Sequence, residues 1–323
     1  MKHWLKTVLV ALSAGFIAGC GNGDDHPPPP ENLAVVATNA GFTSLVAAAT
    51  KADLVPALTS DSSSLTGFAP TDAAFTSLAT ALGFADSAAM VAALDGPTLA
   101  KILSYHVLPM RKDAAALAAG GATQATLYAF PGATPATLAL DTSTGVTITD
   151  AALNKATVTT ADVAASNGVI HVIDKVLVPP GVLTVVQMAQ SNPIFSVLVE
   201  AVVAADLAGT LSGAGPFTVF APTNDAFVAA LGELGLSKDA LLASPDLAGI
   251  LTFHVVAGSL LAADVVALPK PAVVTTLNGA TFSVGSDLGI TDGRARVAKL
   301  VATDVVASNG VVHAIDKVLL PPL

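Results

Sequence analysis

Apolar residues recur at two different spacings along this chain, and the two spacings follow one another in the same order twice. Helical spacing comes first, and residues 122–180 and 272–322 are instead rich in Thr and Val with turn signals between short runs, which is typical of sheet. The pattern therefore predicts helices followed by strands in each half of the chain. The helical stripes at i, i+3, i+4 and i+7 are Phe42, Leu45, Val46, Ala49; Leu99, Ile102, Leu103, His106; Phe195, Leu198, Val199, Val202; and Leu247, Ile250, Leu251, His254.

The closing stretch of each half is nearly the same sequence. Residues 161–180 (ADVAASNGVIHVIDKVLVPP) and 303–322 (TDVVASNGVVHAIDKVLLPP) are identical at 15 of 20 aligned positions, which indicates an internal repeat. In each copy an Asn-Gly pair, whose residues both tolerate positive φ, predicts a tight turn into the second strand of a hairpin that closes a domain. A pair of prolines then ends that strand. The residues that carry this motif are Asn167, Gly168, His171, Asn309, Gly310 and His313.

A second matched motif marks the start of a helix in each half. The sequence FAPTDAAF at 68–75 aligns with FAPTNDAF at 220–227. The proline ends an extended segment, and Thr71 and Thr223 then stand where a side-chain oxygen can accept backbone N–H bonds from the first helical turn. We therefore expect a strand, a threonine N-cap and a helix, in that order, in both copies.

The first residues form a targeting segment rather than part of a folded domain. Two lysines precede an apolar run over 8–17, and the tetrapeptide IAGC that ends at Cys20 resembles a bacterial lipobox. We expect residues 1–19 to be a signal peptide and Cys20 to be lipidated, which would anchor the protein to a membrane. An ordinary signal peptide with an incidental cysteine is the alternative. Gly21 rather than Asp follows the cysteine, which by analogy with Gram-negative sorting favours the outer membrane or cell surface.

The segment after the cysteine and the charge of the remaining chain narrow the class of partner. Residues 20–32 contain four consecutive prolines, and we expect them to form a Pro-rich tether that holds the folded part off the membrane. Removal of the signal peptide leaves 12 basic and 24 acidic residues, a net charge of −12. An acidic chain of this kind is unsuited to nucleic acid and to electrostatic docking on anionic lipid.

Three landmarks that recur in order carry a resemblance to a known family. The FAPT motif, Tyr105-His106 or Phe253-His254, and the SNGV…HxIDKVLxPP ending resemble the fasciclin domain, in two tandem copies at 33–180 and 181–323. The resemblance implies an α+β fold, in which each domain is a twisted β-wedge or sandwich with helices packed on one side. It also implies adhesion at a cell surface through a protein or glycan partner, and it makes the Tyr-His and Phe-His pairs the candidate partner-binding residues.

The four histidines of these motifs allow two interpretations. Each can be a ligand, a base or a partner contact, or else a satisfied, partly buried histidine that ties helix to sheet through its ring nitrogens. A triad of Ser166, His171 and Asp174 is disfavoured, because positions 171 and 174 point to opposite faces of one strand. With a single cysteine and no H-E-x-x-H motif, we expect no metal, no cofactor and no catalytic residue.

One basic cluster stands out in the second half. Arg294, Arg296 and Lys299 lie in its sheet region, where they favour an exposed edge strand protected by charge, with an anion or acidic-glycan contact as the alternative. For the whole chain, the favoured function is adhesion or surface recognition without catalysis. The alternatives are a carrier of small hydrophobic ligands between helices and sheet and, third, a histidine-dependent hydrolase.

Overall fold

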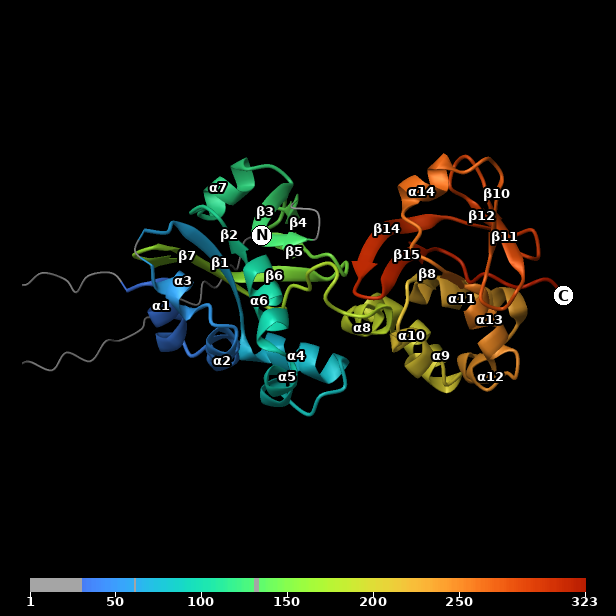
Figure 1. Ribbon diagram of the computed structural model, residues 1–323, viewed down its shortest axis with the longest axis horizontal. Helices are drawn as coiled ribbons and strands as arrows, with labels where there is room; N and C mark the ends of the chain where they lie inside the picture. The colour runs from blue at the N-terminus through green and yellow to red at the C-terminus, as the bar shows by residue number, and fades with distance from the viewer. Residues whose placement is uncertain (1–30, 61, 131–133) are drawn as a thin grey trace, which may run out of the picture.

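The computed structural model describes residues 31–60, 62–130 and 134–323, and these residues form two α+β domains in tandem (Figure 1). In each domain most helices lie on one side of the strands, and a single short helix, α7 or α14, lies toward the other side. The α+β fold and the duplication expected from the sequence are thereby confirmed. The signal peptide, Cys20 and the tether up to residue 30 lie outside the described residues.

The first domain is built on one seven-stranded sheet with the strand order β2-β1-β7-β6-β5-β4-β3. All its neighbouring strands are antiparallel except β1 and β7, which pair in parallel from the Leu65–Gly168 pair to the Pro70–Ile173 pair. Its helices are α1 (Leu33–Asn39), α2 (Thr43–Lys51), α3 (Val55–Thr59), α4 (Asp72–Ala81), α5 (Ser87–Ala93), α6 (Gly96–Tyr105) and α7 (Ala114–Ala119). Its strands are β1 (Leu65–Pro70), β2 (Val107–Leu108), β3 (Thr123–Phe130), β4 (Thr134–Asp141), β5 (Thr147–Thr149), β6 (Lys155–Ala165) and β7 (Gly168–Ile173).

The second domain repeats this topology, but its strands form two four-stranded sheets, β14-β15-β8-β9 and β10-β11-β12-β13. The long β6 of the first domain corresponds to two separate strands here, β13 and β14. The helices are α8 (Val185–Ser191), the 3-10 helix η1 (Pro193–Phe195), α9 (Ser196–Ala204), α10 (Ala208–Ser212), α11 (Asn224–Leu234), α12 (Lys238–Leu242), α13 (Leu247–Phe253) and α14 (Ala262–Ala267). The strands are β8 (Phe217–Pro222), β9 (Val255–Ala257), β10 (Ala272–Thr275), β11 (Thr281–Val284), β12 (Ile290–Thr291), β13 (Val297–Ala298), β14 (Leu300–Ala307) and β15 (Gly310–Ile315).

The two threonines of the FAPT motifs act as the sequence predicts. Thr71 accepts a hydrogen bond at Oγ1 from the backbone N–H of Ala74, and Thr223 accepts one from Ala226. Each threonine has extended backbone angles, follows a strand that ends at the motif's proline, and begins the next helix. A local capping bond thus sets the point at which each chain segment turns from strand to helix.

The Asn-Gly pairs lie in the predicted hairpins, but the reason that each hairpin requires glycine differs from the predicted one. Neither Gly168 nor Gly310 has a positive φ. A Cβ on Gly168 would instead lie 2.3 Å from the carbonyl oxygen of Leu65, because the parallel strand β1 passes directly beside it. A Cβ on Gly310 would meet Phe217 in the same way, at 2.0 Å. Close approach of two strands, rather than turn geometry, therefore requires glycine.

The two domains contact each other at their junction. The side-chain amide of Asn192 in the second domain donates to Ala152 O in the first at 2.8 Å. Each end of the junction is also bound within its own domain, because the hydroxyl of Tyr128 donates to Pro180 O at 3.1 Å and the backbone N–H of Gly181 donates to Val306 O at 2.8 Å. Buried apolar side chains also form one continuous cluster that includes residues of both halves. The junction is thus short and held on both sides, while a domain boundary between residues 180 and 181 stays a prediction.

Candidate functional site

The two histidines that end the helical stripes have both ring nitrogens hydrogen-bonded to backbone. His106 Nδ1 lies 2.7 Å from Ile102 O, and its Nε2 accepts the backbone N–H of Leu177 at 2.8 Å. Since Nε2 must accept, the proton of the neutral ring is on Nδ1 and is donated to Ile102. His254 repeats this arrangement with Ile250 O and the N–H of Leu319, both at 2.8 Å. Burial lowers the pKa of His106 and of His254 to about 4.

The two strand histidines use the opposite tautomer. The Nδ1 atom of His171 accepts the backbone N–H of Asp162 at 3.3 Å, so its Nε2–H donates to Lys112 O at 2.9 Å. His313 is held in the same way by Asp304 N at 3.2 Å and Leu260 O at 2.8 Å. No ring nitrogen of these four histidines is left to abstract a proton from a substrate. Their geometry therefore matches the interpretation of histidines that tie helix to sheet.

The candidate partner-binding pairs are buried. Tyr105 and Phe253 are 0% exposed, and the histidines that follow them are 2% exposed. The hydroxyl of Tyr105 donates to Thr137 O at 2.9 Å, and burial raises its pKa. Phe253 instead packs edge-on against Phe282, with ring centroids 6.1 Å apart. A partner bound to the surface of this structure therefore does not contact these side chains. A role for them in partner binding stays a prediction, and it would be indirect, through their effect on the fold.

Each domain has one buried aspartate, Asp150 or Asp292, that binds the segment after the last strand to the sheet. The sequence analysis did not single out these two residues. The two aspartates are 142 residues apart in the sequence, and the same offset relates His171 to His313. This shared offset is the signal that could have identified them. Asp150 is 5% exposed and Asp292 is 6% exposed. The donors to Asp150 are the backbone N–H groups of Ala152, Asn154 and Val178 and the side chain of Asn154. The donors to Asp292 are the backbone N–H groups of Arg294, Arg296 and Leu320 and the side chain of Arg296.

The expectation of an exposed, charge-protected edge strand at Arg294 and Arg296 is wrong. Both residues lie in the turn between β12 and β13. The guanidinium of Arg296 points inward, where it donates to Asp292 and to Val318 O and forms an ion pair with Glu233 at 2.6 Å. A buried carboxylate that lies four residues away in the same turn attracts the arginine, because an unpaired buried charge is costly.

A cleft of about 400 Å³ opens between the two domains. Its walls come from α4 and the segment after β7 on one side, and from α8, η1 and α9 on the other. Polar and charged side chains line it together with apolar ones, and the side-chain oxygen of Asn154, which is 5% exposed, has no hydrogen-bond partner among the described residues. The polar lining residues include Ser77, Asn154, Asp174, Lys175, Gln190 and Glu200.

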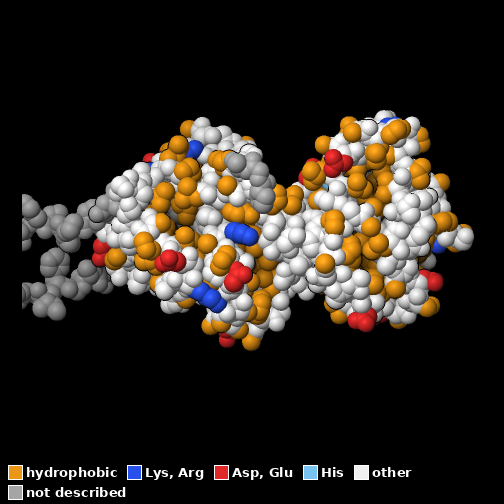
Figure 2. Space-filling model, viewed as in Figure 1, with side chains coloured by type: hydrophobic (Ala, Val, Ile, Leu, Met, Phe, Trp, Pro, Cys, Tyr) orange, Lys and Arg blue, Asp and Glu red, His pale blue; other side chains and the backbone are white. Residues whose placement is uncertain are grey.

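The face drawn in Figure 2 carries few charged side chains, and they are of both signs. Figure 2 shows few Lys, Arg, Asp or Glu side chains on this face, scattered among apolar and neutral groups. Within the described ranges, no three His, Cys, Asp or Glu side chains come close enough together to hold a metal ion. No helix in the described part of the chain combines the length and the apolar character needed to cross a membrane.

Comparison with known proteins gives matches over both halves of the chain. The fasciclin domain family model matches residues 40–179 and 193–321. Protein sll1483 of Synechocystis is 45% identical over 145 residues, which cover 44% of this chain and 75% of that protein. Cell surface glycolipoprotein MPB83 of Mycobacterium bovis is 38% identical over 146 residues, covering 42% of this chain and 59% of that protein. A solved FAS1 domain pair from the insect cell adhesion molecule fasciclin I has a TM-score of 0.45 and 20% identity, covering 88% of this chain and 95% of the other.

Proposed function

This chain belongs to the fasciclin domain family, whose members are cell-adhesion-related surface proteins, and from this premise we propose that it is a lipid-anchored envelope protein for adhesion or surface recognition. In this proposal Cys20 carries the lipid, residues 20–32 form the tether, and the paired domains face outward from the outer membrane or cell surface. Its partner is a protein or a glycan, and it performs no catalysis.

The observation that carries this proposal is the state of the four repeated histidines. Each ring has one nitrogen that donates to a backbone carbonyl and one that accepts a backbone N–H. A histidine that serves as a general base needs a free acceptor nitrogen within reach of the substrate. The groups that a hydrolase of this chain would use are committed to the fold, which favours recognition by surface over reaction.

The cleft between the domains is the surface that we assign to the partner. It combines polar side chains from both domains, among them Ser77 and Asp174 from the first and Gln190 and Glu200 from the second. Because Asn192 binds Ala152 across the junction and one apolar cluster includes residues of both domains, both walls are held in place before the partner arrives. A preformed site binds with a smaller entropic cost than one that must be ordered.

The anchor and the cleft are tested by separate variants of the full-length chain displayed on cells. Cys20→Ser should release the protein from the membrane fraction and abolish cell-to-surface attachment. Ser77→Trp, on the cleft side of α4, should reduce attachment at least tenfold, whereas the matched control Thr76→Trp on the exposed side of the same helix should not. Equal attachment by wild type and Cys20→Ser would overturn the adhesion proposal, and equal attachment by the two tryptophan variants would remove the cleft from it.

A further inference from the structure

The first domain contains an apolar pocket that the adhesion function does not use. Its volume is about 250 Å³, and it lies between the helices α1, α2, α3 and α6 and the parallel strands β1 and β7. Half-exposed Leu127 and the exposed Thr38 and Thr50 lie among its lining residues, so the pocket opens to solvent on that side. Its apolar walls include Leu33, Leu45, Leu58, Leu65, Phe68 and Leu103.

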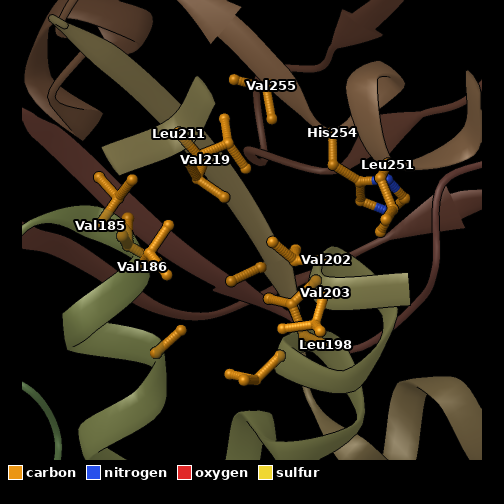
Figure 3. Close-up of a pocket in the computed structure, with 14 residues that line it drawn as sticks. Val185, Val186, Leu198, Val202, Val203, Leu211, Val219, Leu251, His254 and Val255 are labelled. Atoms are coloured by element: carbon orange, nitrogen blue, oxygen red, sulfur yellow. The ribbon is translucent and has the colours of Figure 1, made fainter. Parts of the chain in front are cut away.

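The same place in the second domain is almost filled. There the corresponding pocket, between α8, α9, α10 and α13 and the strands β8 and β15, holds about 40 Å³ (Figure 3). Strand register identifies one cause. Gly67 pairs with Ile170 in the first domain, and Val219 pairs with Val312 at the same point of the second.

The side chain of Val219 is thus replaced by empty space in the first domain. Val219 is 9% exposed and lines the small pocket, where Figure 3 shows its side chain among the other lining groups. A Cβ built on Gly67 would meet no atom within 4 Å. Two pairs of α-helical residues differ in the same sense, since Ala34 and Ala49 line the large pocket where Val186 and Val202 line the small one.

The polar groups around the large pocket are already satisfied by the protein. The hydroxyls of Thr38 and Thr50 donate to the carbonyls of Ala34 and Val46, and the hydroxyl of Ser104 donates to Lys101. Both ring nitrogens of His106 are engaged, and none of the lining residues is Lys, Arg, Asp or Glu. A ligand that needs a charge partner gains nothing in such a pocket, whereas hydrocarbon gains the full benefit of leaving water.

We propose that the first domain, and not the second, binds one free, uncharged aliphatic molecule in this pocket. Since a cavity of roughly 150 Å³ accommodates a ring of six carbons, the present pocket suits a chain of about ten. Aliphatic side chains make up most of its wall, with Phe68 as the one phenyl ring among the lining residues. Duplication has therefore left one copy with a binding pocket and the other with a packed core.

The proposal is tested by isothermal titration calorimetry, in which 1-decanol is added to the full-length Cys20→Ser chain. We expect one site per chain, and at least tenfold weaker binding of decanoate at pH 8. Gly67→Val should weaken 1-decanol binding at least tenfold, while circular dichroism shows the fold retained. The matched double variant Gly67→Val with Val219→Gly should recover one site. Two sites in the original chain, no binding, or unchanged affinity after Gly67→Val would overturn the proposal.

A second measurement separates a free ligand from the acyl group of the chain's own anchor. Hydrogen exchange of α1, α2 and α3 is compared between the anchored wild type in bilayers and the soluble Cys20→Ser chain, both without added ligand. Equal exchange, with protection that appears in both only on addition of 1-decanol, supports a free ligand. If the anchored form is already protected and 1-decanol adds nothing, the chain's own acyl group fills the pocket and the proposal fails.

Discussion

Arg296 donates through Nε to Oδ2 of Asp292 at 3.1 Å, at the position where the first domain has the neutral side chain of Asn154 beside Asp150. The two aspartates are otherwise bound alike. Burial raises the pKa of Asp150 to about 6, because its hydrogen bonds only partly offset the loss of water. Burial also acts to raise the pKa of Asp292, but three backbone N–H groups and the Arg296 side chain outweigh it and hold that pKa below its usual value.

The first prediction is that acid destabilises the second domain before the first. The folded pKa of His106 and of His254 is about 4 against 6.5 when unfolded, so the unfolded chain binds more protons between these values. Each histidine's contribution, about 3 kcal/mol, is present above pH 6.5 and lost as the pH falls toward 4. The raised pKa of Asp150 acts oppositely: the folded state takes up its proton first as the pH falls below 6, which restores about 3 kcal/mol to the first domain alone.

Hydrogen exchange read by mass spectrometry at pH 7 and pH 5 resolves the two domains. Amides of β8 and β15 should lose more protection on acidification than those of β1 and β7, by about 1 kcal/mol in opening free energy. Equal loss in both domains, or greater loss in the first, would contradict the assignment of the two aspartates.

The second prediction concerns the neutral replacement of Asp150. Asp150→Asn removes the cost of a buried charge at neutral pH but also removes acceptor capacity for backbone N–H groups. The variant no longer takes up the proton that offsets the acid loss from His106, so the first domain should lose more stability between pH 7 and pH 5 than the original does. The gap between the two pH values should therefore widen. Denaturant midpoints at pH 5 and pH 7 measure this, and an unchanged gap would show that Asp150 does not titrate in that range.

The third prediction concerns Asn167, whose side chain links three separate segments. Its Oδ1 accepts the N–H of Leu33 at 2.9 Å, and its Nδ2 donates to the carbonyls of Leu58 and Ser60. Asn167→Ala leaves these groups unpaired in a buried place and should cost about 2–4 kcal/mol in urea denaturation. Asn39→Ala, which removes only an exposed bond to Glu31, should change stability by less than about 0.5 kcal/mol and serves as the control.

The fourth prediction tests the close approach of the parallel strands. Gly168→Ala places a methyl group 2.3 Å from Leu65 O, so β1 and β7 must separate, and we expect a loss of about 2 kcal/mol or more. Gly209→Ala in α10 adds the same methyl group where no atom lies within 4 Å. This control should be neutral or stabilising by up to about 1 kcal/mol, because alanine favours helix. Similar thermal midpoints for the two variants would refute the steric explanation.

The fifth prediction distinguishes a buried Tyr105 from one that contacts a partner. Tyr105→Phe removes the bond to Thr137 O and should cost about 1 kcal/mol of stability. Attachment of cells that display this variant should equal that of wild type, since the hydroxyl does not reach the surface. A variant that keeps its stability but loses attachment would instead assign Tyr105 to the partner site.

The sequence by itself determined the elements whose causes are local. The threonine N-caps at Thr71 and Thr223 and the closing hairpins follow from periodicity and from neighbours within four residues. The two copies of the fold follow from motifs that repeat along the chain. The membership of the family likewise followed from motifs that can be read in order along the chain.

Tertiary structure alone decided what each motif residue contacts. Asn167 meets Leu33 across 134 positions, and Gly168 owes its identity to a strand that begins at Leu65. The difference between Gly67 and Val219 becomes a pocket in one domain only because helices pack over that strand. Local spacing specifies the face of the helix or strand on which a side chain lies. The atoms that it contacts there belong to distant segments of the chain. Those contacts determine how deeply the side chain is buried, how its pKa is shifted and whether a cavity remains beside it.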